Sequence, residues 1–418
     1  MTLECLIALI VFLVTYALIA LRKIPGTKIG RAGIALIGGA LMIVLGILPF
    51  TEIWTYINYE LLLLLFGMML IVAGLESVGF FDIIVKRLIA GGSGRRKFLV
   101  SLMLLSATLS ALMLNDAVVL LLTPVTVKCC RILKADPVPF LVGLFISSNI
   151  GSVATAVGNP QNAYIATQAG ITFIEFSVRM LPLMLITIFV AVAMIVLFFR
   201  KDLDRIKDTG NTDEIEEAEK DPLRLKAMFV LLLATVILFT LSDMLGIPLY
   251  VVALISGAVA LLIGMTKGVK RAVWMVRRVD WSIILFFVGL FVLMGGVVTS
   301  GLLTQITGLF PGFGEGETPS IAGLTALSAV LSNLFSNVPS VILISEMIPS
   351  QEVFWITLAA SSTLAGNATL IGAAANMIVA EGAEKYNVKL DFWRAVKIGL
   401  PVAIVSLLIT IVYMEFIF

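Results

Sequence analysis

The sequence predicts an all-α polytopic membrane protein made of two inverted repeats, each with five transmembrane helices and one re-entrant hairpin. Of the 418 residues, 60% are hydrophobic and only 13% are charged, whereas soluble domains carry about a quarter charged residues. The charges are also clustered, and uncharged stretches of roughly 20 residues, the length of a membrane span, separate the clusters. The third observation is a set of matched polar motifs in the two halves of the chain.

The first apolar stretch, Leu6 to Leu21, follows Glu4 and has no positively charged leader. A secretory signal would carry such a leader, so we interpret this stretch as a permanent helix. Three cysteines are too few for a disulfide framework, and the absence of histidine removes the usual zinc and proton-shuttle ligand. We therefore expect no metal centre and no cofactor other than Na⁺ or H⁺ as a coupling ion. The neighbours Cys129 and Cys130 would suit a thiophilic metalloid, but ordinary packing near a helix end is the favoured interpretation.

Lysine and arginine predict the orientation in the membrane. All of the 29 basic residues except Arg179 lie in six short segments: 22–31, 86–97, 128–134, 200–226, 267–278 and 385–397. Placing all six in the cytoplasm satisfies the positive-inside rule. The prediction is a protein of the inner (cytoplasmic) membrane with ten crossings and both termini outside. The predicted helices are 3–21, 33–50, 61–79, 141–168, 178–199, 227–243, 248–265, 282–300, 353–381 and 396–417.

Two apolar stretches remain after these crossings, and both are predicted to be re-entrant hairpins. Residues 98–127 have positive charge on both sides, so both ends are expected in the cytoplasm. The stretch is too long for one untilted span of about 20 residues, but it suits two half-helices that meet in mid-membrane. Residues 319–348 have no positive charge at either end and fit a hairpin that enters from outside.

The two halves align at fixed offsets. FGMMLIVAGLESVG (66–79) matches VGLFVLMGGVVTSG (288–301) at an offset of 222, which also carries Asn115 onto Asn337. SSNIGSVATAVGNPQN (147–162) matches SSTLAGNATLIGAAAN (361–376) at an offset of 214. A shared hydrophobic bias does not predict matched Asn, Thr and Gly. We therefore divide the chain into a first repeat (1–200), a cytoplasmic linker (201–226) and a second repeat (227–418).

An odd number of crossings in each half turns the second copy upside down in the membrane. Inverted repeats with interrupted helices are typical of alternating-access carriers. Four polar, glycine-rich runs mark the interruptions: Leu114–Ala117 and Ser336–Ser340 at the hairpin tips, and 148–162 and 366–376 in the broken helices 141–168 and 353–381. Such runs are unfavourable in a bilayer unless they line a cavity or are buried in protein.

A helix that breaks in mid-membrane exposes N–H groups at one new end and carbonyls at the other. The N–H end suits an oxyanion or hydroxyl oxygens, whereas carbonyls with Asn, Ser and Thr oxygens suit Na⁺. The alternative is polar packing between helices. Asp116 is the acidic residue expected near the bilayer centre, and its repeat partner is Val338. An intramembrane carboxylate marks an ion path, so we predict a role in cation coupling; capping of the half-helix is the alternative.

These motifs resemble the ion transporter superfamily, which includes arsenite permeases, silicon efflux carriers, sodium–dicarboxylate carriers and NhaD-type sodium/proton antiporters. LNDAVVLLLTP (114–124) is similar to the arsenite-permease hairpin, and NIGSVATAVGNPQN and AGNATLIGAAAN resemble the broken helices of that family and its anion permease relatives. The resemblance covers nearly the whole chain. It implies a scaffold domain and a transport domain, with the solute between the hairpin tips and the broken helices. The tips read Leu-Asn-Asp and Ser-Asn-Val rather than the Ser-Asn-Thr of dicarboxylate carriers, which argues against dicarboxylates.

The runs and the resemblance together select two sets of residues. The candidates for solute binding are Asn115, Asn149, Gly151, Ser152, Thr155, Asn159, Ser336, Asn337, Gly366, Asn367 and Thr369. The candidates for the coupling ion are Asp116, Asn115, Asn162, Asn337 and Asn376.

The leading hypothesis is a secondary active transporter of a small inorganic oxyanion or neutral oxyacid, similar to arsenite or silicate, coupled to H⁺ or Na⁺. The alternative is a sodium/proton antiporter in which Asp116 alone binds the exchanged cations. An enzyme is not expected, because the sequence has no nucleophile–base pair, phosphate loop or metal cluster. The expected partners are the lipid bilayer and the small solute, without nucleic acid, and the protein is expected to be a monomer or homodimer.

Overall fold

The computed structural model describes residues 2–21, 29–81, 83, 94–203, 221–310, 312, 313 and 318–418. In these ranges the chain forms helices without a β-strand, which confirms the all-α fold class. Six of the described helices are long and apolar enough to cross a membrane by length and composition, and four shorter apolar helices accompany them. Most of the predicted linker 201–226 lies outside the described residues, as do Arg22, Lys23, Lys28, Lys86 and Arg87.

The helices follow the predicted order in both halves. The first half contains α1 (Leu3–Leu21), α2 (Arg31–Val44), η1 (Phe50–Glu52), α3 (Ile53–Tyr56), α4 (Tyr59–Ser77), α6 (Arg95–Leu112), α7 (Asn115–Ile132), α8 (Val138–Ser152), α9 (Pro160–Ala169), α10 (Phe173–Phe198) and α11 (Arg200–Leu203). The second contains α12 (Pro222–Leu241), α13 (Leu249–Met265), α14 (Val269–Arg278), α15 (Trp281–Thr299), α16 (Leu302–Thr307), α17 (Ile321–Phe335), α18 (Asn337–Ser345), α19 (Glu352–Ala365), η3 (Gly366–Ala368), α20 (Ala374–Glu384) and α21 (Phe392–Ile417).

Helices α2, α4, α13 and α15, which we call the frame helices, pack in two close pairs, α2 with α15 and α4 with α13. Glycines allow this approach. A Cβ atom on Gly67 of α4 would lie 2.4 Å from the carbonyl carbon of Ala253, and one on Gly289 of α15 would lie 2.5 Å from that of Ala35. Small residues at such crossings let two helix backbones touch in a membrane protein. Gly67 and Gly289 are repeat partners at the offset of 222, so the same glycine contact between helix backbones occurs in both halves.

Two helical hairpins, α6–α7 and α17–α18, pack on α8 and α19 respectively. Met113 and Leu114 join α6 to α7, while Ser336 alone joins α17 to α18 with a left-handed φ of 76°. Helix α8 ends at Ser152 and α9 begins at Pro160, a residue whose fixed φ and missing N–H suit the first helical position. The second interruption lies between α19 and α20, so both predicted helix breaks are present.

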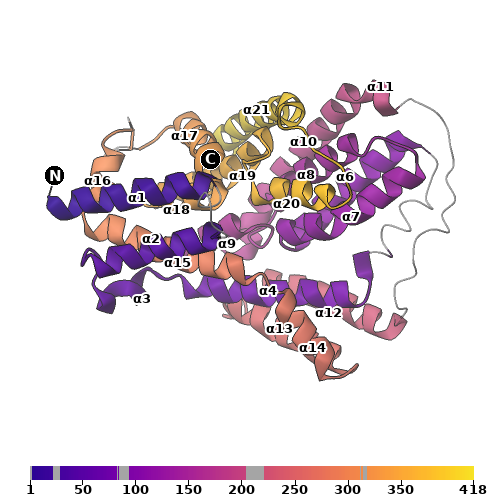
Figure 1. The fold of residues 1–418 in the computed structure, drawn as a ribbon, viewed down its shortest axis with the longest axis horizontal. Helices are drawn as coiled ribbons and strands as arrows, with labels where there is room; N and C mark the ends of the chain where they lie inside the picture. Colours follow the sequence, from indigo (N-terminus) through magenta and orange to yellow (C-terminus); the bar gives the residue numbers. More distant parts are fainter. Residues whose placement is uncertain are drawn as a thin grey trace.

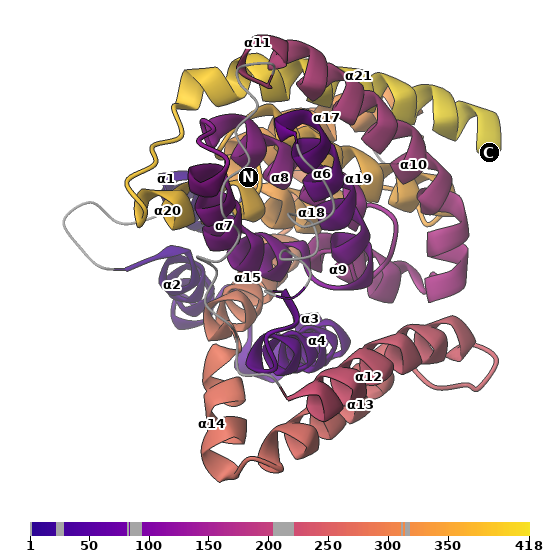
Figure 2. The same ribbon diagram turned by 90° about the vertical axis from the view of Figure 1, so that its right-hand side faces the viewer.

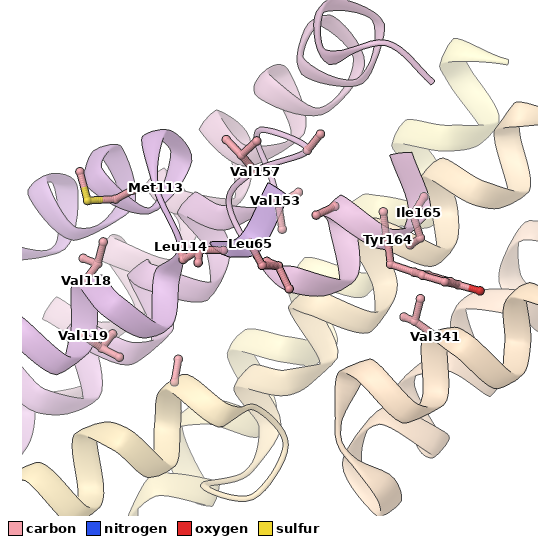
Figure 3. Packing of buried hydrophobic residues seen from close by; sticks show 14 of the residues in the cluster. Leu65, Met113, Leu114, Val118, Val119, Val153, Val157, Tyr164, Ile165 and Val341 are labelled. Carbon is pink, nitrogen blue, oxygen red and sulfur yellow. The ribbon is translucent and has the colours of Figure 1, made fainter. Parts of the chain in front are cut away.

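The hairpins and broken helices occupy the middle of the molecule, between the frame helices and the pair α10 and α21 (Figures 1 and 2). Buried apolar side chains of α4, α7, α9 and α18 surround this region, including Leu65, Val119, Ile165 and Val341 (Figure 3). The same pairs of repeat-equivalent helices pack in both halves, since α1 contacts α2 as α12 contacts α13, and α8 contacts α10 as α19 contacts α21. The inverted orientation in a membrane and the re-entry of the hairpins stay predictions.

Candidate functional site

A cluster of neutral polar side chains lies where the hairpin tips meet the broken helices, and we call it the amide cluster. None of its members is more than 5% exposed. It consists of Asn115, Asn149, Asn159, Gln161, Asn162, Asn337, Thr363, Asn367 and Asn376. The cluster therefore brings together candidates from both halves of the chain.

Asn149, near the end of α8, links the first hairpin to the second broken helix. Its Oδ1 accepts a hydrogen bond from Asn115 Nδ2 at 3.1 Å. Its Nδ2 donates to Asn367 Oδ1 at 3.0 Å and to Asn376 Oδ1 at 2.8 Å. Residues more than 200 positions apart in the sequence thus share one buried network.

Asn162 and Asn376 close the two helix breaks in the same way. Asn162 Nδ2 donates to the carbonyls of Ser152 (3.0 Å) and Thr155 (3.2 Å). Asn376 Nδ2 donates to those of Gly366 and Thr369, both at 2.7 Å. Every residue in the second set lies 214 positions after its partner in the first. The amides satisfy carbonyls that the broken helices leave without an intrahelical partner.

The hairpin tips contact the broken helices directly. The backbone N–H of Asn115 donates to the carbonyl of Gly158 at 2.9 Å. The Asn337 amide is assigned from its surroundings: with its nitrogen toward the carbonyls of Ser362 and Gly372, it donates to them at 3.1 and 2.9 Å. Its oxygen accepts from Gln161 Nε2 at 3.2 Å, which connects the second tip to the first broken helix.

The other solute-binding candidates lie around the cluster with different contacts. Thr155 donates to the Ala111 carbonyl at 2.7 Å, and Thr369 donates to Asn333 Oδ1 at 3.1 Å. Gly151 is a packing position, because a Cβ atom there would lie 2.2 Å from the carbonyl oxygen of Ala107. Ser152 donates to the Asn149 carbonyl at 2.8 Å and accepts from Asn159 Nδ2 at 2.9 Å. The Gly366 carbonyl accepts the hydrogen bond from Asn376 Nδ2 described above.

Ser336 lies at the edge of this arrangement, not in it. The residue is half-buried, and its carbonyl accepts a hydrogen bond from the Ser340 hydroxyl at 3.0 Å.

Two atoms in the amide cluster have no hydrogen-bond partner among the described residues, Asn115 Oδ1 and Asn367 Nδ2. One is an acceptor and the other a donor, and both side chains are bonded to Asn149. Buried polar groups are normally paired, and an unpaired one costs about 1–3 kcal/mol. A hydrogen-bond donor would satisfy Asn115 Oδ1, and an acceptor would satisfy Asn367 Nδ2.

Asp116 lies outside the amide cluster, although Asn115 precedes it. The half-buried carboxylate lines a cavity of about 100 Å³ together with Glu76, Arg278 and Asp280. Arg278 and Glu76 form an ion pair at 2.9 Å, whereas Asp116 forms none with the described residues. Asp116 therefore lines a charged cavity at the ends of α4 and α15, whereas the amide cluster consists of neutral side chains.

A second cavity, of about 280 Å³, lies at the opposite ends of α4 and α15 and is lined by Glu60 and Glu346 among other residues. It is the repeat counterpart of the cavity beside Asp116. Phe291, Met294, Val298 and Ile342 in the second cavity correspond at the offset of 222 to residues of the first: Met69, Val72, Glu76 and Leu120. The chain thus has a cavity on each side of the amide cluster.

The sequence reasoning missed Gln161 and Thr363 as site residues. Thr363 accepts hydrogen bonds from Asn159 Nδ2 and Gln161 Nε2 at 3.3 and 3.2 Å, and it donates to Asn162 Oδ1 at 3.4 Å. The repeat contained the signal, because Thr363 is the partner of Asn149 at the offset of 214. Gln161 belongs to the polar run before Asn162.

Apolar helices, hairpins with polar tips and two broken helices around a buried polar centre define a polytopic membrane transporter. The chain belongs to the citrate transporter family (CitMHS), whose sequence model matches residues 16–353. An uncharacterised transporter of Mycobacterium tuberculosis (strain ATCC 25618 / H37Rv) is 31% identical, over 98% of this chain and 97% of that protein.

More distant relatives include transporters with a named solute or gene. The silicon efflux transporter LSI3 of Oryza sativa subsp. japonica is 28% identical over 95% of this chain and 94% of its own length. The putative transporter arsB of Dictyostelium discoideum is 27% identical over 96% of this chain and 90% of its own length. Among solved structures, the Alcanivorax borkumensis YdaH transporter has the same fold, with a TM-score of 0.57 and 15% identity over 99% of this chain and 97% of that one. These relatives are transporters and not enzymes.

Proposed function

We propose that this protein is a secondary active transporter of a small neutral oxyacid, or of the corresponding oxyanion, coupled to H⁺ or Na⁺. The observation that carries the proposal is the amide cluster, with its unpaired Asn115 Oδ1 and Asn367 Nδ2. Hydroxyl groups of an undissociated oxyacid donate and accept hydrogen bonds, so this class of solute matches both kinds of unpaired atom. Arsenous and silicic acid are the model solutes.

The charges of the amide cluster and of the two cavities favour a neutral solute over an anion. The amide cluster contains no charged side chain, and the larger cavity beside it is lined by Glu60 and Glu346 without a Lys or Arg. The basic residue in the other cavity, Arg278, is paired with Glu76. A citrate or dicarboxylate ion would therefore meet carboxylates without fixed positive charge to balance its own. The relative named as a silicon efflux transporter agrees with this solute class.

Asp116 supplies the coupling step in this proposal. A carboxylate in a cavity separate from the amide cluster can exchange a proton or Na⁺ without contact with the solute. The same separation is the observation that favours a second candidate function, sodium/proton antiport at Asp116 without solute movement. The two functions differ in whether solute flux accompanies cation exchange.

Transport in proteoliposomes tests the proposal. Wild type and Asp116→Asn are compared for uptake of arsenite, silicate, sulfate, phosphate, citrate and dicarboxylates under imposed pH or Na⁺ gradients. We expect gradient-driven flux of arsenite or silicate in the wild type. The variant should lose concentrative uptake, because an amide cannot exchange a proton or balance a cation.

Thermal unfolding of both proteins in detergent provides the control for folding. Cation exchange without any solute flux would reject the oxyacid proposal and establish the antiporter. Citrate flux without oxyacid flux would reject the neutral solute class.

A further inference from the structure

Helix α14 (Val269–Arg278) is a short amphipathic segment that connects two frame helices, α13 and α15. In Figure 1 it runs steeply across the direction of α4. In Figure 2, where α4 is seen end-on, α14 lies lengthwise at the edge of the molecule. Its axis thus runs across the spans rather than along them, which is the orientation of a helix at a membrane surface.

One side of α14 is fixed to the protein. Met275 is fully buried. Arg271 Nη2 donates to the Ser77 carbonyl at 3.0 Å, and Arg278 pairs with Glu76 at 2.9 Å. These contacts hold the helix against the end of α4 and decide which side faces outward.

The outward side carries apolar and basic residues in adjacent stripes. Val269 and Val273, one helical turn apart, are 64% and 44% exposed. Lys270 and Arg277, seven residues apart and therefore on one face, are exposed, and neither has an ion-pair partner among the described residues. Lys267, by contrast, forms an ion pair with Asp221 at 3.7 Å.

The repeat counterpart of α14 supplies an internal comparison. Residues 47–56 precede α4 as α14 precedes α15, at the offset of 222. This segment exposes Phe50 and Trp54 (70% and 73%) but contains no Lys or Arg. Aromatic residues occur at both membrane surfaces, whereas basic residues gather at the cytoplasmic one. The two segments therefore match opposite surfaces of one bilayer.

We propose that α14 lies in the interface on the predicted cytoplasmic side and binds the phosphate of an anionic phospholipid through Lys270 and Arg277. Val269 and Val273 enter the acyl-chain region beneath the headgroup. The adjacent Arg278 pairs with Glu76, a residue that lines the cavity beside Asp116. A lipid bound to α14 is therefore close to that cavity, because Arg278 of α14 is one of its lining residues.

Lipid titration of the full-length protein in neutral detergent tests the proposal. Thermal unfolding is followed while phosphatidylglycerol, phosphatidylcholine with the same acyl chains, or inorganic phosphate is added. We expect phosphatidylglycerol alone to raise the unfolding temperature. Lys270→Gln/Arg277→Gln should weaken its apparent affinity roughly thirtyfold, since each basic residue near an anionic surface contributes about a fivefold change.

Lys385→Gln/Lys389→Gln is the matched control, because it removes two exposed charges from the same predicted side of the protein. This variant should keep the wild-type affinity. An equal loss in both double variants would overturn the proposal in favour of general electrostatic attraction. An equal response to inorganic phosphate would replace the lipid by a free anion. If Lys270→Gln/Arg277→Gln unfolds even with phosphatidylcholine present, Lys270→Gln alone is tested instead. Its affinity for phosphatidylglycerol should fall about fivefold. An unchanged affinity would reject the site.

Discussion

At the scale of single residues, the site is a network in which neutral side chains satisfy each other and a few backbone carbonyls. Asn149 makes three of its hydrogen bonds to other amides, while Asn162 and Asn376 each bond two carbonyls at a helix break. In a low-dielectric interior such a network is rigid when complete and unfavourable when partly unpaired. The unpaired Asn115 Oδ1 and Asn367 Nδ2 are therefore the atoms at which we propose that a solute binds.

The hairpin tips give a prediction at this scale. Asn115→Ala and Asn337→Ala should each weaken solute binding about tenfold, because each removes one hydrogen bond of roughly 1.5 kcal/mol. Asn115→Ala should keep its stability, since the hydrogen bond from its N–H to the Gly158 carbonyl uses the backbone. Asn337→Ala should stay folded with a lower unfolding temperature, because it also removes the side-chain bonds to Ser362, Gly372 and Gln161. Solute-dependent thermal stabilisation measures the change. Thr240→Ala is the control, because its hydroxyl bonds only the Val236 carbonyl of its own helix; unchanged binding in both tip variants would remove the tips from the site.

At the scale of elements, the frame helices depend on close backbone contact at Gly67 and Gly289. A methyl group at either position would lie within 2.5 Å of backbone atoms of the facing helix. The helices have to separate, and overpacking of this kind typically costs about 1–3 kcal/mol. Because the two glycines are repeat partners, the two substitutions should have similar effects.

The corresponding prediction is that Gly67→Ala and Gly289→Ala each lower the unfolding temperature of the purified protein by several degrees. Gly30→Ala is the matched control, since no atom lies within 4 Å of the added methyl group and its φ of −89° suits any residue. A melting temperature equal to that of the wild type in both variants would show that the frame helices tolerate separation.

At the scale of the whole molecule, the orientation in the membrane is open to a direct test. The three native cysteines are buried, so the wild type should not react with a membrane-impermeant maleimide. In spheroplasts, Phe418→Cys should react because the charge distribution predicts an outside C-terminus. Lys128→Cys should react only after permeabilisation. The reverse pattern would invert the predicted topology and, with it, the side assigned to α14.

The sequence by itself determined the helical class, the order of the spans and hairpins, and the positions of both helix breaks. The lengths of the hydrophobic stretches, the positions of Gly and Pro and the internal repeat are properties of the sequence itself, so they can be recognised without the tertiary structure. The polar runs also contained nearly every member of the amide cluster. The composition of each run could be read, but not the partners of its side chains.

The tertiary structure alone decided which polar residues meet. Asn149 donates hydrogen bonds to Asn367 and Asn376, more than 200 residues away in the sequence. Thr363, which sequence reasoning missed, belongs to the same network. Asp116 and Asn115 are neighbours in the chain but point into different environments, because successive residues on a helix project about 100° apart. Long-range hydrogen bonds and side-chain direction depend on how helices pack, and no local pattern in the sequence specifies that packing.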